Sequence, residues 1–378
     1  MAAAQGGTTV RVWDEAAGGA VWMKEGLYVR RDGFWMRSGA LCLVATVVLA
    51  ASAAALADPA KDLRALTGAP SRVAWVRHLG DGKDIFTTTN DNRLMGFDTE
   101  DGKGEREILA ADGNYHRPMI TPAGSRLIYS NYTTGTVHVV NWDGSGHREL
   151  TAGAAAAIWR DPATRKEWVY VQTGKETGKE SRKNPIRRYL IDDPKTNELV
   201  WDKTPTDPDN FQMSFDGRQA CSLTPWPRFG LVDLSGATFT ELGEGCCASM
   251  APESAGMLFH LLGDHRHLMI YSPERQMKWR VSVNGAPGVD GYEIYHPRWS
   301  NRVQFLALCG PFRGQGGITA EIYVGKFNAA IEHVESWVRL TTNEKGDFYP
   351  DLWVSPVGAP AVRFTMSGVP VPIAPTGE

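Results

Sequence analysis

The sequence predicts an all-β fold, a six-bladed β-propeller of four-stranded blades that is closed by a C-terminal strand completing the first blade. From residue 71 to residue 356, short runs rich in Val, Ile, Tyr and Trp recur between Gly, Pro, Asn or Asp, which is typical of strands and tight turns. The runs fall into groups of four. The last run, Phe348–Ser355, has the pattern of the opening strand that the first group lacks. Such a strand closes the ring and removes its open edges, whereas a two-sheet sandwich would not explain a split group.

The most regular group lies within Arg117–Thr151. Its four predicted strands are Pro118–Ile120, Arg126–Ser130, Thr136–Trp142 and His147–Thr151. A four-stranded sheet of this kind cannot bury both of its faces alone. It must therefore pack against copies of itself, and the chain has to supply them.

Five further groups repeat this arrangement, and in chain order the group within Arg117–Thr151 is the second of six. The first group comprises Ser71–Arg77, Asn92–Asp98 and Glu105–Leu109. The third comprises Ala156–Arg160, Glu167–Gln172, Ile186–Ile191 and Leu199–Trp201. The fourth comprises Phe211–Phe215, Gln219–Leu223, Gly230–Leu234 and Thr238–Leu242. The fifth comprises Ala248–Ala251, Gly256–Leu262, His267–Tyr271 and Trp279–Val283. The sixth comprises Pro297–Ser300, Val303–Leu308, Ala320–Phe327 and Val334–Thr341.

The segments outside the propeller have different patterns. Residues 1–57 read as a leader and a secretory signal peptide. The signal consists of a basic start at Met36, an apolar run over 41–56 and a site of small residues that ends at Ala57, and this pattern predicts cleavage after Ala57. A membrane anchor is the alternative, but the run has roughly 16 residues and a span needs about 20. Translation could start at Met23 or Met36. We expect a linker over 58–70, a strand or Pro-rich tail over 357–378, and a periplasmic or extracellular mature chain without a membrane span.

Composition limits the functions further. The net charge of −3 argues against a broad nucleic-acid surface, and 42% hydrophobic residues allow a large core. Four cysteines remain after processing: Cys221, Cys246, Cys247 and Cys309. An exported protein could pair Cys221 with Cys246 or Cys247, or all four could be buried thiols. No C-x-x-C motif for zinc or redox chemistry is present.

Particular motifs carry a family resemblance. Thr121-Pro-Ala-Gly-Ser-Arg-Leu-Ile-Tyr-Ser, followed by Val137-His-Val-Val-Asn-Trp-Asp-Gly-Ser-Gly, resembles the repeat of TolB-like propellers, a WD-repeat-like group, and Ser214-Phe-Asp-Gly-Arg echoes its turn. Trp159-Arg-Asp-Pro and Gly291-Tyr-Glu-Ile-Tyr-His-Pro-Arg-Trp-Ser-Asn are similar to motifs of exported, uncharacterised bacterial proteins of this group. The resemblance implies the fold but no activity, because propellers host binding proteins, scaffolds and enzymes alike.

The default site is the channel mouth, where the loops that lead into the six innermost strands converge. Tyr349-Pro350 echoes His296-Pro297 and Arg117-Pro118, and the fifth blade contributes Cys246 and Cys247. Nearby aromatic residues suit stacking on sugars or aromatic side chains, although strands also need aromatics for packing. The residues that we predict to bind ligand are His116, Arg117, Trp159, Arg160, Gln212, His296, Arg298, Tyr349 and Asp351.

Metal binding would need more ligands than this ring supplies. His116 and His296 occupy matching places in two blades and Gln212 lies at a third, so imidazole and amide ligands could hold a divalent ion. The oligogalacturonate lyases, which are TolB-like relatives, build a manganese site from such residues. No local cluster completes the set here, and we predict no cofactor. Alternatively, the two histidines hydrogen-bond neighbouring loops and hold the blade starts in place.

Other clusters have ordinary explanations. Asp264-His265-Arg266-His267 reads as a polar hairpin between two strands, and Asp161, Asp351 and Glu293 come from different blades, so their separation as an acid/base pair is open. We therefore expect a non-enzymatic propeller that binds an envelope or extracellular protein, or a carbohydrate, at the channel mouth. The alternatives are a lyase or hydrolase acting on polysaccharide, and a purely structural domain.

Overall fold

The computed structural model describes residues 9–14, 19–24, 58–174, 184–253, 256–289, 291–312, 319–356, 362–364 and 370–372. The chain divides into two compact units, Met1–Ala55 and Leu56–Glu378. In the first unit, β1 (Thr9–Asp14) and β2 (Gly19–Lys24) form an antiparallel pair. The predicted signal sequence over 36–57 lies outside the described residues.

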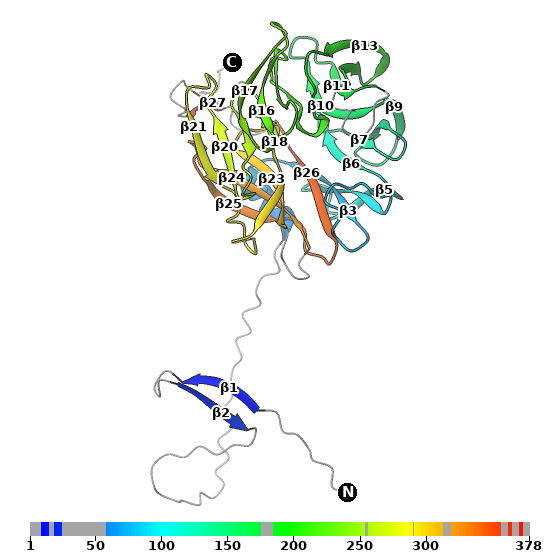
Figure 1. Cartoon of the computed structure of the whole chain (residues 1–378). Helices are drawn as coiled ribbons and strands as arrows, with labels where there is room; N and C mark the ends of the chain where they lie inside the picture. Colours follow the sequence, from blue (N-terminus) through cyan, green and yellow to red (C-terminus); the bar gives the residue numbers. More distant parts are fainter. Residues whose placement is uncertain are drawn as a thin grey trace, which may run out of the picture. The chain divides into compact units, whose positions relative to one another are not determined.

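The second unit contains six four-stranded antiparallel sheets, the blades of a propeller (Figure 1). Blade 1 is β26 (Gly346–Val354), β3 (Ser71–His78), β4 (Asn92–Asp98) and β5 (Arg106–Gly113). Blade 2 is β6 (His116–Ile120), β7 (Arg126–Asn131), β8 (Thr136–Asn141) and β9 (Arg148–Ala152). Blade 3 is β10 (Ala154–Arg160), β11 (Glu167–Gln172), β12 (Ile186–Leu190) and β13 (Asp193–Trp201).

The remaining blades follow in chain order. Blade 4 is β14 (Gln212–Met213), β15 (Gln219–Leu223), β16 (Arg228–Asp233) and β17 (Thr238–Glu244). Blade 5 is β18 (Cys246–Met250), β19 (Leu258–Leu261), β20 (His267–Tyr271) and β21 (Lys278–Ser282). Blade 6 is β22 (Glu293–Trp299), β23 (Phe305–Phe312), β24 (Glu321–Phe327) and β25 (Val334–Arg339). The six-bladed prediction is confirmed.

The ring closes as predicted. Strand β26 pairs antiparallel with β3, so that Val354 lies opposite Ser71 and Gly346 opposite His78. A C-terminal strand is thus the innermost strand of the first blade. This pairing gives the first blade its fourth strand and joins the two ends of the propeller in one sheet.

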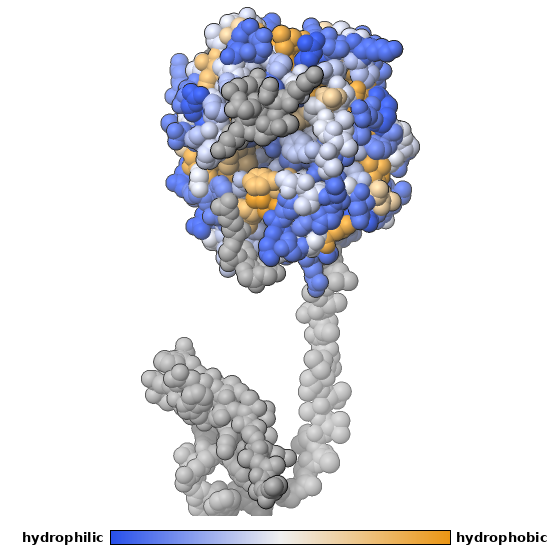
Figure 2. Space-filling model, turned by 45° about the vertical axis from the view of Figure 1, so that its right-hand side comes forward, coloured by the Kyte–Doolittle hydropathy of each residue, from blue (hydrophilic) through white to orange (hydrophobic). Residues whose placement is uncertain are grey.

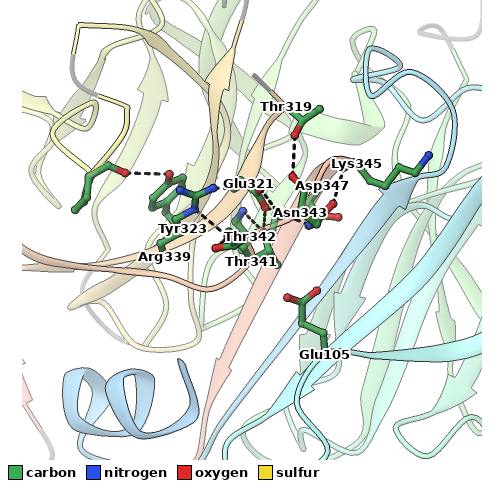
Figure 3. Close-up of polar contacts among 12 residues, drawn as sticks. Glu105, Thr319, Glu321, Tyr323, Arg339, Thr341, Thr342, Asn343, Lys345 and Asp347 are labelled. Atoms are coloured by element: carbon green, nitrogen blue, oxygen red, sulfur yellow. Dashed lines mark hydrogen bonds and ion pairs between the residues drawn. The ribbon is translucent and has the colours of Figure 1, made fainter. Parts of the chain in front are cut away.

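A buried polar network joins blade 6 to blade 1 beside this closure (Figure 3). The fully buried Asp347 accepts two hydrogen bonds of 2.8 Å from the Arg77 guanidinium. Asn343 donates to both Asp347, at 2.9 Å, and Glu321, at 3.3 Å, and lies between them in Figure 3. Burial raises the pKa of Glu321. The network therefore ties β26, β3 and β24 together with mutually satisfied groups, which a buried polar cluster requires.

The segment that we expected to be a linker contains a helix. Helix α1 (Pro59–Thr67) starts at Asp58, whose side chain accepts hydrogen bonds from the Ala60 and Lys61 N–H groups, and it ends at Gly68. Leu63 of α1 is fully buried in a cluster with apolar residues of β3, β24 and β26. A capped helix with one apolar side chain in the core is ordered by packing.

Tryptophans at the ends of two innermost strands hold neighbouring blades together. The Trp353 Nε1–H of blade 1 donates to the Pro122 carbonyl of blade 2, at 3.2 Å. The Trp159 Nε1–H of blade 3 donates to the Phe215 carbonyl of blade 4, at 2.9 Å. Each ring lies against a turn glycine with positive φ, where a Cβ on Gly124 would lie 2.4 Å from Trp353. The TolB-like turn motif thus makes a tryptophan-and-turn contact between blades.

On the face shown in Figure 2, hydrophobic residues form separate patches among hydrophilic ones. A short pair, β27 (Val362–Phe364) and β28 (Pro370–Pro372), lies in the segment predicted as a strand or tail. Among the described residues, no helix is both long and apolar enough to cross a membrane.

Candidate functional site

Bulges at the start of four innermost strands shape the channel mouth. The pairing with the second strand shifts register at Arg117, Cys247, His296 and Tyr349, in blades 2, 5, 6 and 1. These four residues have φ of 49°, 51°, 49° and 52°, in the left-handed region that non-glycine residues rarely adopt. Three of them precede a proline, which normally favours an extended conformation. Such strain costs of order 1–3 kcal/mol per residue and concentrates at functional sites.

The strand pairing corrects one prediction. His116 and His296 do not occupy matching places. His116 pairs opposite Ser130 and corresponds to Tyr295, which pairs opposite Cys309, whereas His296 corresponds to Arg117. The bulge lies at the same place in both blades, so the offset comes from the sequence itself, where the residue before the proline is Arg117 in blade 2 and His296 in blade 6.

A cavity of about 540 Å³ lies at the mouth. Its lining comes from blades 1, 2, 4, 5 and 6. A cavity of this size suits a small ligand or part of a larger one. Among its lining residues are Phe86, Arg117, Asp209, Gln212, Trp226, Cys246, His265, Tyr295, His296, Arg298 and Tyr349.

Blade 4 reaches across the channel to blade 2. The 3-10 helix η2 (Pro208–Asn210) carries Asp209, whose Oδ1 lies 2.8 Å from Nε2 of His116. On the other side of the imidazole ring, His116 Nδ1 lies 2.9 Å from the Phe86 carbonyl oxygen. The Thr87 hydroxyl lies 3.1 Å from the same Nδ1. His116 therefore connects the loop of blade 4 that carries Asp209 to the loop of blade 1 that carries Phe86.

The charge of Asp209 is stabilised in place. Burial alone would raise its pKa, but the charge and hydrogen bond of His116, together with Arg117 and His296, lower it to about 2. Tyr132 stacks on the His116 ring at 4.2 Å between centroids and donates to Asp209 from its hydroxyl. Asp209 is thus an ionised acceptor at the cavity wall.

His296 and Arg117 line the cavity, and each has one buried nitrogen without a partner among the described residues. His296 Nδ1 faces the Tyr349 N–H at 3.4 Å, and the two rings stack at 3.6 Å. Nδ1 is therefore an acceptor, which places the ring proton on Nε2, and burial lowers the pKa of His296 well below its ordinary value. Arg117 binds the Ala156 carbonyl through Nη1 at 2.7 Å. Within the described part of the chain, neither Nε2 of His296 nor Nη2 of Arg117 has a hydrogen-bond partner, although the residues are only 8% and 5% exposed.

Two further predicted residues form an ion pair. Arg298 Nε lies 3.2 Å from Asp351 Oδ1, while Asp351 Oδ2 accepts from the Ile120 N–H at 2.7 Å. Burial lowers the pKa of Arg298 to about 10. Gln212 lines the cavity, but its Oε1 accepts from Ser249 and from the Met250 N–H.

Trp159 and Arg160 lie elsewhere. Strand β10 starts at Ala154 and runs away from the mouth, so these residues stand at its far end, where Trp159 makes the contact with blade 4. A strand advances about 3.3 Å per residue, which separates them from its start by roughly 20 Å. The glycine and alanine residues at that start carry no polar side chain.

Each candidate acid/base residue contacts a partner other than the two further candidates. Asp351 pairs with Arg298, Glu293 faces His265, and Asp161 accepts hydrogen bonds from Ala163 and Thr164 in a turn at the far end of β10. No group of three or more metal-ligating side chains is arranged for an ion among the residues that the structure describes. The sulfurs of Cys221, Cys246, Cys247 and Cys309 are free thiols.

The predicted polar hairpin divides between two environments. His267 binds Asp264 at 2.7 Å and contacts Arg280 on the surface. His265, with φ of 50°, instead turns into the cavity beside Cys246. Sequence reasoning also missed Phe86, Trp226 and Asp209, which come from loops within or between blades. Only Asp209 had a local signal, since Asp207-Pro208 is a helix-start pattern.

Comparison with known proteins supports the fold. No family model matches the sequence, and no curated protein matches it. TolB from Acinetobacter baumannii is similar in structure, with a TM-score of 0.52 and 12% identity, over 77% of this chain and 69% of that one. The chain has a TolB-like propeller fold.

Two other solved structures agree. Hydrazine synthase of Kuenenia stuttgartiensis has a TM-score of 0.52 and 12% identity. The match covers 83% of this chain and 52% of the hydrazine synthase chain. A chain of the nidogen/laminin complex has a TM-score of 0.50 and 8% identity, over 75% of this chain and 98% of that one. At such identities the likeness concerns the fold alone, so function is argued from the site.

Proposed function

We propose that this TolB-like propeller is a binding protein whose channel mouth takes a neutral, hydroxyl-rich ligand, that is, a carbohydrate. The observation that carries the proposal is a pair of buried N–H donors without partners in the described part of the chain, Arg117 Nη2 and His296 Nε2, on two residues that line one cavity. A buried donor without a partner costs about 1–3 kcal/mol, and a ligand oxygen would remove that cost.

The charge balance favours a neutral ligand over an acid. Arg117, Arg298 and His116 supply the basic groups in or next to the cavity. They are matched by Asp209 and Asp207 of the lining and by Asp351, which pairs with Arg298. An additional carboxylate would face these acids, whereas a hydroxyl can donate to a carboxylate and accept from an N–H.

Aromatic side chains complete the argument. Tyr295 and Tyr349 line the cavity, and Phe86 and Trp226 stand at it with 48% and 57% of their surface exposed. Aromatic faces bury the C–H faces of sugar rings while the hydroxyls reach polar groups. The same two exposed rings favour a second candidate, docking of a protein partner, because exposed aromatics are frequent energetic centres of interfaces.

Binding of neutral oligosaccharides on a glycan array, followed by calorimetry, tests the proposal. His296→Phe keeps a ring to stack on Tyr349 but removes the Nε2 donor, and Trp226→Ala removes an aromatic face. We expect each to weaken binding by about tenfold or more, which corresponds to about 1.4 kcal/mol. Phe215→Ala is the matched control, since Phe215 is an exposed aromatic of blade 4 in the turn contacted by Trp159.

The outcomes separate the candidates. Equal binding by His296→Phe and the parent would refute the donor argument. Failure of all neutral glycans, together with Trp226-dependent capture of a protein partner from the cell envelope, would favour docking.

We also propose that the mature protein is periplasmic or extracellular. The predicted cleavage after Ala57 would leave Asp58 at the N-terminus, where its side chain still caps α1. N-terminal sequencing of secreted protein should return Asp58, and recovery of an uncleaved apolar segment would contradict export by this signal.

A further inference from the structure

A thiol, an imidazole and a carboxylate lie in series at the blade 5 side of the cavity. The Cys246 Sγ lies 4.0 Å from Nε2 of His265, and the Nδ1 of the same ring lies 3.6 Å from Glu293 Oε2. Both Cys246 and His265 line the cavity. This is the order of groups that activates a cysteine nucleophile: the sulfur, a base within reach, and a third group that orients the base.

The surroundings fix the imidazole. The His265 ring meets Tyr295 edge-to-face at 5.0 Å between centroids and lies 6.5 Å from Phe312. Its backbone accepts from the Ile294 N–H at 2.8 Å, and its N–H closes a turn on the Leu262 carbonyl at 2.9 Å. A left-handed backbone at His265 and at Cys247 brings the hairpin and the bulge toward the same opening. Packed rings and a closed turn pre-organise a base better than a mobile loop would.

The electrostatics of the two adjacent thiols differ. The Cys247 thiol and the His265 imidazole interact with the Cys246 sulfur and, against the effect of burial, lower its pKa to about 6. The Cys246 contact and burial raise the pKa of Cys247. Cys309 lies 3.5 Å from Nδ1 of His296, and burial raises its pKa. Of these three cysteines, Cys246 is the one whose thiolate form is favoured, and thiolates are the reactive form of cysteine.

We propose that Cys246 is a nucleophile for small acyl esters that enter the channel mouth, with His265 as its base and Glu293 as the residue that positions His265. An acyl group fits because Arg117 and His296, two residues that line the cavity, each have a buried N–H group without a partner among the residues that the structure describes, which a carbonyl oxygen would satisfy once the side chain turns toward it. His265 takes the thiol proton, and Sγ forms a bond to the carbonyl carbon. The C–O bond to the alcohol then breaks, and the alkoxide takes the proton from His265. Water then gives a proton to His265 and attacks the thioester carbonyl carbon. The C–S bond breaks, the carboxylic acid leaves, and His265 returns the proton to the Cys246 sulfur.

The test is reaction of the full chain with p-nitrophenyl acetate. We expect a burst of nitrophenol close to one equivalent and, by peptide mapping, an acetyl group on Cys246. Cys246→Ser should abolish the burst, and His265→Gln should slow it by about tenfold or more, since a general base typically contributes 10²–10⁴-fold. His267→Gln is the matched control, because His267 also binds a carboxylate in the same hairpin but lies on the surface.

A positioning role for Glu293 has its own readout. Glu293→Gln should shift the pH midpoint of Cys246 alkylation by iodoacetamide upward from about 6, which lost packing alone would not do. Acetylation of another cysteine, an unchanged burst in Cys246→Ser, or equal rates in His265→Gln and His267→Gln would overturn the proposal. Should His265→Gln fail to fold, an alkylation midpoint for the parent protein above pH 8 would overturn it independently. Carbohydrate binding by calorimetry is measured separately, so the two proposals can fail independently.

Discussion

Replacement of Gly124 by alanine tests the contact between a tryptophan and the turn of the next blade. A Cβ at this position would lie 2.4, 2.5 and 2.8 Å from three atoms of the Trp353 ring, and φ at Gly124 is 77°. Gly135, in the same blade, has φ of 68° but no atom within 4 Å of a built Cβ. The two substitutions therefore share the backbone cost and differ in the clash.

The expected magnitudes follow from this difference. A left-handed non-glycine residue costs roughly 1–2 kcal/mol, which applies to both variants. At Gly124, overpacking adds about 2 kcal/mol and loss of the Trp353 hydrogen bond to Pro122 adds about 1 kcal/mol. An unfolding entropy of about 2.1 cal/mol/K per residue over roughly 300 residues converts 3 kcal/mol into a melting-temperature difference of about 5 °C.

Differential scanning calorimetry of the two variants and the parent measures this difference. Gly124→Ala should melt about 5 °C below Gly135→Ala, by the entropy conversion above. The double variant Gly124→Ala/Trp353→Leu should recover part of the loss, because a smaller side chain leaves room for the methyl group. Equal melting temperatures for the two single variants would mean that the tryptophan ring moves aside at no cost and does not hold the blades together.

Two further predictions concern buried ionisable groups. Asp347→Asn should lower the free energy of unfolding by about 3 kcal/mol, because it leaves the Arg77 guanidinium without its buried carboxylate. Glu105 binds the same arginine at its exposed side, so Glu105→Gln should lower the free energy of unfolding by about 1 kcal/mol or less. Denaturant titrations measure both changes. Burial lowers the pKa of His260 to about 4, so the folded protein keeps this ring neutral. The unfolded chain takes up the proton at about pH 6.5, so the contribution of this group to the free energy of unfolding is fully present above that pH. This free energy falls by about 3 kcal/mol as the pH falls to about 4. The melting temperature of His260→Leu should change less over this pH range than that of the parent. A parent profile as flat as that of the variant would contradict the second prediction, and equal losses in the two carboxylate variants would contradict the first.

The sequence by itself determined the strands, the number of blades and the closure of the ring. Strand alternation, turn residues and the repeat are local properties, and a tandem repeat multiplies the same local signal. The split first blade could be read because Phe348–Ser355 resembles the other opening strands even though its partner, β3, lies far away in the sequence. Helix α1 was missed because it has only nine residues and a single fully buried apolar side chain.

Only the tertiary structure decided which side chains meet at the channel mouth. His116 contacts Asp209 across the channel, whereas the Nε2 of His296 is buried without a partner among the described residues. His265 and His267 look alike in the sequence, yet one faces a thiol and the other the surface. The physical reason is that a shift of one residue in a strand reverses the direction of a side chain, and contacts across the ring depend on backbone geometry from several blades at once.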